Sequence, residues 1–248
     1  MRIAILSDIH GNADALAAVL DDLAGRSVDA TICLGDHLSG PLEARRTADM
    51  LMASPIACIA GNHDRALVTT PRSEMGPSDG HAYDQLSGAH VAWLKGLPAS
   101  LSVGPVIAWH GTPASDVEYW LETVEGGRMR LADRDLVEAR ACTPAAAIGP
   151  SNLLLCGHTH MPRVVRLKSG AIVVNPGSVG LQGYTDDAPV HIMQVGAPEA
   201  RYAVAEKRCA GWAVVHHTVP YDTANVIRLA REAGRPEWAS ALESGWIA

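Results

Sequence analysis

Five short apolar runs, separated by stretches with helical periodicity, constrain the fold of this chain more than any other feature. Each run has only four or five residues, a length typical of a buried strand rather than of a core helix. The runs lie at residues 3–6, 30–34, 56–60, 106–109 and 153–156. Apolar strands that alternate with helices are typical of an α/β protein in which parallel strands are buried on both faces.

Helical patterns occupy most of the gaps between these runs. Asn12 can cap a helix in which apolar residues recur from Leu16 to Leu23 at spacings of three and four residues. Further helices are predicted over about residues 42–53, 81–95, 133–141 and 223–233, with a last short helix after the Gly-Arg-Pro at 234–236.

The second half of the chain predicts a different arrangement. Residues 163–167 and 171–175 flank a short connection with a glycine, which predicts a β-hairpin, and further strands are expected at 190–195, 201–206 and 213–219. We therefore predict an α/β fold with two facing mixed β-sheets flanked by helices, in a single domain over residues 1–248. The segment 112–151 has few clear signals and is a candidate cap over a site.

Polar residues of a restricted kind follow each apolar run. They are Asp8 and His10, then Asp36, then Asn62, His63 and Asp64, then His110, and finally His158 and His160. Ligands bind outside the carboxyl ends of the strands in α/β sheets, so we expect these side chains to gather around one crevice. A glycine next to each cluster permits close backbone approach and a sharp turn. Imidazoles mixed with carboxylates favour a site for manganese, iron, zinc or nickel over one for magnesium or calcium.

Charge and composition exclude several classes of protein. The chain has 20 Lys and Arg against 27 Asp and Glu, a net charge of −7, which argues against a long nucleic acid as partner. No apolar stretch approaches the roughly 20 residues of a membrane helix, and the N-terminus turns polar too early for a signal peptide. Five cysteines without a C-x-x-C pair do not predict a disulfide framework. We expect a cytoplasmic protein without a membrane partner, and the sequence does not predict its oligomeric state.

The ordered clusters resemble the motifs of the calcineurin-like metallophosphoesterases, in particular the small bacterial and archaeal phosphodiesterase-type members. The family pattern D-x-H, G-D, G-N-H-D/E, H and G-H-x-H is matched between residues 8 and 160, and Asn-Pro-Gly-Ser-Val at 175–179 extends it. The resemblance implies two facing sheets flanked by helices and two divalent metal ions, with manganese favoured. It implies one ion on Asp8, His10, Asp36 and His160, and a second on Asp36, Asn62, His110 and His158, with Asp36 bridging.

Residues 62–65 carry the candidate catalytic and substrate-binding groups. A water shared by two metal ions becomes a nucleophilic hydroxide at neutral pH. His63 follows the ligand Asn62 directly, so the backbone holds it beside the metals, and we expect it to act as general acid. Asp64 either orients His63 or caps a helix. Asn62, His63 and Arg65 are candidate substrate contacts, although Arg65 also fits the description of an ordinary surface arginine.

The function that we predict is metal-dependent hydrolysis of phosphoester bonds, with small phosphodiesters or nucleotides as substrates. Protein phosphatases of this superfamily carry arginines near the second and third motifs, whereas this chain has Ser39, Gly40 and Ala60 there. Two alternatives remain open, a non-catalytic metal-binding scaffold of the same fold and a nuclease, and the acidic charge argues against the nuclease. The roles of His37 and of the segment 112–151 are not assigned.

Overall fold

The computed structural model describes residues 1–141 and 148–248. The first of its β-sheets has five strands in the order β14 (Gly211–Val219), β13 (Ala200–Arg208), β1 (Arg2–Leu6), β2 (Ala30–Cys33) and β3 (Ala57–Cys58). Strands β1, β2 and β3 run parallel, whereas β13 and β14 form an antiparallel pair that joins β1 from the other side. The sheet is therefore mixed, as predicted.

The second sheet is also mixed. Its strand order is β4 (Ser100–Val103), β5 (Val106–Trp109), β8 (Leu153–Leu155), β10 (Ile172–Asn175) and β9 (Arg163–Arg166). The central strands β5, β8 and β10 are parallel, and the edge strands β4 and β9 are antiparallel to their neighbours. The predicted hairpin is the pair β9–β10.

The main core lies between the two sheets. Ile5 and Leu34 from the first sheet meet Val106, Leu155 and Val174 from the second in one cluster of buried side chains. Each such side chain contributes about 1.5–3 kcal/mol when it is fully buried. Since the strands are apolar on both faces, helices must cover the outer faces, which is why the sequence shows continuous apolar runs rather than alternation.

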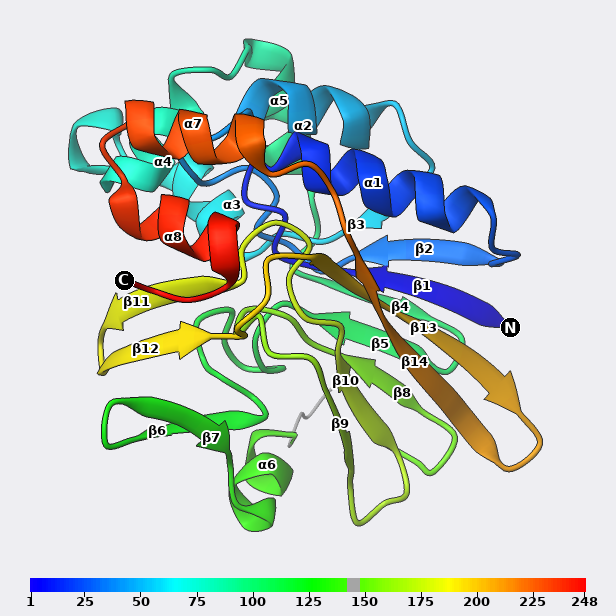
Figure 1. Ribbon diagram of the computed structural model, residues 1–248. Helices are drawn as coiled ribbons and strands as arrows, with labels where there is room; N and C mark the ends of the chain where they lie inside the picture. The colour runs from blue at the N-terminus through cyan, green and yellow to red at the C-terminus, as the bar shows by residue number, and fades with distance from the viewer. Residues whose placement is uncertain (142–147) are drawn as a thin grey trace.

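Helices cover the outer face of the first sheet and one end of the molecule (Figure 1). Helix α1 (Ala13–Ala24) begins after Asn12, whose side chain accepts a hydrogen bond from the Ala15 N–H at 3.0 Å, and it packs Leu16 and Val19 on the sheet. The other helices on this side are α2 (Ala44–Met52), α3 (Asn62–Thr69), α4 (Pro77–Tyr83), α5 (Gly88–Gly96), α7 (Ala224–Glu232) and α8 (Pro236–Ser244). Helix α6 (Arg134–Arg140) packs Val137 against the outer face of the second sheet. Among the described helices, none has the length and apolar character that crossing a bilayer requires.

The prediction of one helix over residues 81–95 is wrong, because the structure has two helices there. Helix α4 ends at Tyr83 and α5 begins after Ser87. The Ser87 hydroxyl accepts a hydrogen bond from the His90 N–H at 3.3 Å, and the His90 ring accepts one from the Ser87 N–H at 3.1 Å. This reciprocal capping starts a new helix where apolar periodicity alone suggested continuation.

A small third sheet was not predicted. It contains four strands in the order β11 (Gly183–Asp187), β12 (Val190–Gln194), β7 (Arg128–Leu131) and β6 (Glu122–Glu125). Hairpin β6–β7 belongs to the segment 112–151, so part of the candidate cap is a hairpin of this third sheet, near the ends of the strands of the second sheet (Figure 1). Residues 142–147 of the candidate cap lie outside the described residues.

Candidate metal centre

The predicted ligands lie in the loops that follow β1, β2, β5 and β8 and at the start of helix α3. Five of them have a left-handed backbone conformation, with φ between 54° and 65°. They are Asp8, His10, Asp36, His158 and His160, and the described residues contain no other non-glycine residue with positive φ. Such conformations cost on the order of 1–3 kcal/mol each and persist where the surrounding structure imposes them, commonly at functional sites.

These loops approach one another closely enough to require glycine. A Cβ on Gly61 would lie 2.2 Å from Asp36 Oδ1, and a Cβ on Gly35, whose φ is +106°, would lie 2.4 Å from the Gly61 nitrogen. The expectation that glycines beside the clusters allow close backbone approach is therefore confirmed at these two positions.

The first group of ligand atoms comes from Asp8, His10 and His160, whose donor atoms all lie within 4.8 Å of one another. The Nε2 atoms of the two imidazoles are 3.0 Å apart, and Nε2 of His160 lies 3.6 Å from Asp8 Oδ1. All three residues are buried, and Asp8 Oδ1 has no hydrogen-bond partner in the described part of the chain.

The second group contains Asp36, His110 and His158, again within 4.8 Å of one another. Nε2 of His110 lies 3.2 Å from Asp36 Oδ2 and 3.1 Å from the side-chain oxygen of Asn62. The structure thus divides the histidines as the resemblance implied. It groups Asp36 with the second set, and the bridging role of Asp36 stays a prediction.

His158 and His160 are separated by one residue. In an extended strand the side chains of two such residues lie on the same side, but both histidines have a left-handed backbone conformation. Their side chains therefore enter different groups, His158 with Asp36 and His160 with Asp8.

The ring orientation of all four histidines fits metal binding. One ring nitrogen of each lies against a backbone carbonyl: His10 Nδ1 against Ser39 at 2.8 Å, His160 Nδ1 against Leu181 at 2.8 Å, His110 Nδ1 against Leu34 at 2.7 Å and His158 Nε2 against Val117 at 3.1 Å. A carbonyl only accepts hydrogen bonds, so that nitrogen carries the hydrogen, and in the neutral ring the other nitrogen presents a lone pair.

The lone pairs then face other electron-rich atoms. Nε2 of His10 faces Nε2 of His160, and Nε2 of His110 faces the oxygens of Asp36 and Asn62. Such contacts are repulsive unless a cation or a proton lies between them. Histidine held from behind by a carbonyl is the usual arrangement of a metal ligand, so the donor set fits two divalent ions.

Burial sets the charge state of most of this cluster. It lowers the pKa of His10 to about 4 and that of His158 to about 3, and it lowers the pKa of His160 well below its usual value. Neutral imidazole is the form that binds a metal. Burial also lowers the pKa of His110, but the charge of Asp36, the hydrogen bond to it and the charge of Asp8 together prevail and raise that pKa to about 9. A proton on His110 stabilises the charge of the Asp36 carboxylate, as a bound cation would.

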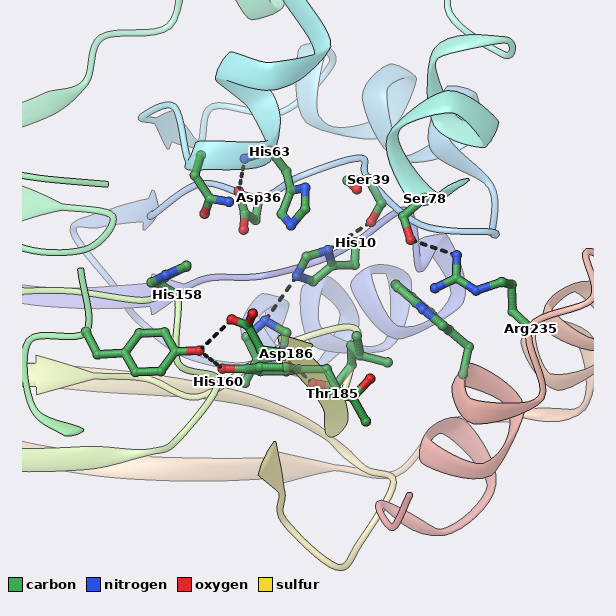
Figure 2. A pocket seen from close by; sticks show the side chains of 15 residues that line it. His10, Asp36, Ser39, His63, Ser78, His158, His160, Thr185, Asp186 and Arg235 are labelled. Carbon is green, nitrogen blue, oxygen red and sulfur yellow. Dashed lines mark hydrogen bonds between the residues drawn. The ribbon is translucent and has the colours of Figure 1, made fainter. Parts of the chain in front are cut away.

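His63 lies at the cavity with its own carboxylate partner. Its backbone N–H donates to Asp36 Oδ1 at 3.0 Å (Figure 2), and its Nδ1 lies 2.9 Å from Asp79 Oδ1. Burial lowers the pKa of His63, but the charge of Asp36 and the hydrogen bond to Asp79 prevail and raise it to about 9. The side chain remains 37% exposed. The sequence does not predict Asp79 as a residue of the site, because no local pattern around residue 79 points to this role.

Among the described residues, the Asp64 carboxylate forms no hydrogen bond with His63, which it would need in order to orient that ring. Its buried carboxylate accepts hydrogen bonds from the backbone N–H groups of Asp36 at 2.8 Å, His37 at 3.1 Å and Gly61 at 2.9 Å, and from Nδ1 of His37 at 2.7 Å. The bond to Gly61 caps helix α3, which was the alternative interpretation of this residue. Asp64 therefore joins the second and third loops of the site and acts as a positioning residue.

Arg65 does not line the cavity, and the expectation of a substrate contact from it is not supported. Its guanidinium forms two hydrogen bonds with the Asp116 carboxylate, at 2.6 and 2.9 Å, and the side chain is 52% exposed. The pair connects helix α3 to the loop that follows β5.

A cavity of about 390 Å³ lies directly beside the two ligand groups. Besides metal-centre residues and His63, its lining consists of residues from distant segments that the sequence analysis did not single out as site residues: Ser39, Ser78, Tyr119, Leu181, Tyr184, Thr185, Asp186, Arg235 and Trp238. The ring centroid of Tyr119 lies 5.0 Å from that of His158, and the centroid of Tyr184 lies 4.9 Å from that of His160. The ligands therefore border a cavity with aromatic and polar walls.

Comparisons with known proteins place the fold of this chain among the metallophosphoesterases. The chain is 29% identical to a metallophosphoesterase from Sphaerobacter thermophilus, whose crystal structure matches with a TM-score of 0.74 over 99% of this chain and 100% of that one. A hypothetical protein from Pyrococcus horikoshii is 19% identical, with a TM-score of 0.71 over 100% of this chain and 99% of that one, and shares the fold. An uncharacterized protein of Methanocaldococcus jannaschii is 22% identical, in an alignment that covers 95% of this chain and 94% of that protein.

A family model gives the assignment. The model of the calcineurin-like phosphoesterase superfamily domain matches residues 1–197, which contain every predicted metal ligand. Because this match covers most of the 248 residues, the chain belongs to the calcineurin-like phosphoesterase superfamily.

Proposed function

We propose that this calcineurin-like phosphoesterase hydrolyses small phosphodiesters or nucleotides and that it uses two divalent transition-metal ions, manganese first among them. The observation that carries the proposal is the pair of adjacent groups of His and Asp ligand atoms, both bordering one cavity. Mixed nitrogen and oxygen donors suit manganese, iron, zinc or nickel.

Each metal position is defined by residues that the fold already holds. Asp8, His10 and His160 would hold one ion, and Asp36, Asn62, His110 and His158 would hold the other. When bound, such ions stabilise negative charge on phosphoryl oxygens and lower the pKa of a coordinated water. The carbonyls behind the imidazoles fix the ring orientation, so little reorganisation is needed when substrate arrives.

His63 is the residue that we assign as general acid. Because Nδ1 is held by Asp79, Nε2 is the nitrogen left to carry a proton to the leaving-group oxygen. The backbone bond from His63 to Asp36 keeps this ring beside the second ligand group without making it a ligand. Figure 2 shows its imidazole pointing into the cavity, above His10.

The test compares the effect of His63→Gln on two phosphodiesters with different leaving groups. A poor alkoxide leaving group needs the proton, whereas 4-nitrophenolate does not, so we expect turnover to fall about 10²–10⁴-fold on an alkyl diester and far less on the aryl diester. Metal content, measured by elemental analysis, should stay at the wild-type level. Equal losses on both substrates would remove His63 from this role.

The matched control is His81→Gln, which changes an exposed histidine on the neighbouring helix α4. It should alter neither substrate's turnover. A metal-loaded wild-type protein that is inert towards a broad panel of phosphoesters would instead favour a non-catalytic scaffold. Cleavage of long DNA at rates similar to those of small diesters would favour a nuclease.

A further inference from the structure

Arg235 provides a cationic group at one end of the cavity, on the far side from the second ligand group. Figure 2 shows Arg235 beside Ser78, while His158 lies at the opposite side of the view and Asp186 lies between them near His160. Among the described residues that line the cavity, Arg235 is the only lysine or arginine. It lies in the segment beyond residue 197, where the family match ends.

Hydrogen bonds hold the guanidinium of Arg235 in place, but they occupy only some of its N–H groups. Its Nε donates to Glu237 at 2.5 Å, and its Nη1 donates to the Ser78 hydroxyl at 2.9 Å. A guanidinium has five N–H groups, so these two bonds leave three on the Nη1 and Nη2 edge. No hydrogen bond from those three groups is found within residues 1–141 and 148–248. The side chain is 23% exposed and lines the cavity.

Trp238, a residue of helix α8, fixes this helix against the site. Trp238 is buried, and its ring lies edge-on to the ring of His10, with the centroids 6.0 Å apart. It also fills the space that a side chain on Gly40 would need, since a Cβ there would lie 2.8 Å from Trp238 Cη2. The Arg235 guanidinium lies 5.8 Å from the Trp238 ring centroid. The C-terminal helix thus presents a preorganised cation to the cavity, which reduces the entropy cost of binding an anion.

We propose that Arg235 and Ser78 form a subsite for a second phosphate group of the substrate, separate from the phosphoester that is cleaved. The Nη1–Nη2 edge matches two phosphate oxygens, which is the geometry in which arginine binds phosphate best. This subsite rests on the proposed function, because it assumes that the scissile phosphoester lies at the metal centre. It narrows the substrate class to phosphoesters with a further phosphate, such as phosphorylated nucleotide diesters or dinucleoside polyphosphates.

The test uses two substrates that differ only in the second phosphate. They are thymidine 5′-(4-nitrophenyl phosphate) and the same compound with a 3′-phosphate. Wild-type enzyme should have the lower KM for the 3′-phosphorylated compound. In Arg235→Gln, loss of a charge-assisted contact should raise that KM by about tenfold to hundredfold while kcat and the KM of the unphosphorylated compound change by less than about threefold.

Control variants separate recognition from a structural effect. Arg231→Gln removes an exposed arginine of helix α7, paired with Glu243, and should change neither KM. Arg235→Lys keeps the charge but loses the planar edge, so it should recover only part of the preference. If Arg235→Gln changes both substrates equally, or if wild-type enzyme does not distinguish them, the subsite is refuted.

Failure of the proposed function can be told apart from failure of the subsite. If neither compound is hydrolysed, calorimetric titration of the metal-loaded protein with adenosine 3′,5′-bisphosphate and with adenosine 5′-monophosphate still tests the subsite. Tighter binding of the bisphosphate that is lost in Arg235→Gln supports it, and equal binding of the two nucleotides overturns it.

Discussion

Replacement of Asp64 by asparagine tests how the two central loops of the site are held together. The carboxylate accepts four hydrogen bonds, three from backbone N–H groups and one from the ring of His37. Both side chains are fully buried, so solvent does not screen their interaction. Burial lowers the pKa of His37, but the charges of Asp64 and Cys58 and the hydrogen bonds to them together prevail and raise that pKa well above its usual value.

The magnitude follows from counting what asparagine cannot accept. Its amide keeps one acceptor oxygen, and if that oxygen replaces Oδ2, the new NH₂ group faces the His37 N–H. One buried N–H then loses its partner, at a cost of about 1–3 kcal/mol. The imidazole of His37 also loses its buried counter-charge, and breaking such a pair costs about 3–5 kcal/mol in total. We therefore expect Asp64→Asn to lower the free energy of unfolding by about 3–5 kcal/mol.

Urea denaturation in excess chelator measures this effect without the contribution of metal binding. The matched control is Asp84→Asn, because Asp84 is 59% exposed and pairs with Arg72 at the surface. That change should leave the free energy of unfolding nearly unchanged, because an exposed ion pair contributes little to stability. Equal free energies of unfolding for the two variants would refute the assignment of Asp64 as the residue that joins the loops. The double variant His37→Gln/Asp64→Asn should be less destabilised than the sum of the single variants, because the two side chains interact directly.

Two further predictions concern the metal centre and Arg65. Chelator should abolish phosphodiester hydrolysis and lower the melting temperature. A divalent ion at 100 times its dissociation constant should restore about 2.7 kcal/mol of stability. A melting temperature that changes with neither treatment would contradict the ligand assignment. Arg65→Gln breaks an exposed ion pair with Asp116, so it should lower the free energy of unfolding by less than about 1 kcal/mol and leave KM for small diesters unchanged. A rise in KM of more than about tenfold would show that Arg65 contacts the substrate.

The fold could be predicted to the level of two mixed sheets because its strands are short, apolar and separated by glycine and polar clusters. Predictions failed where one local signal overrode another. The capping pair Ser87 and His90 divides the helix expected over 81–95. The third sheet escaped prediction because β6, β7 and β11 contain many polar and charged residues and lack the apolar run of a buried strand.

The sequence by itself indicated the candidate ligands of the metal centre, because each of them follows a strand and ligands bind outside the carboxyl ends of strands in α/β sheets. Only the tertiary structure decided which atoms face which. The left-handed turns at His158 and His160, the carbonyls behind the imidazoles and the pairing of His63 with Asp79 depend on loops packed against each other. Arg235, directly before helix α8, lines the cavity although it lies 157 residues from its partner Ser78 in the sequence. Contacts between such distant segments leave no periodic pattern in a single sequence, because packing rather than local preference selects them.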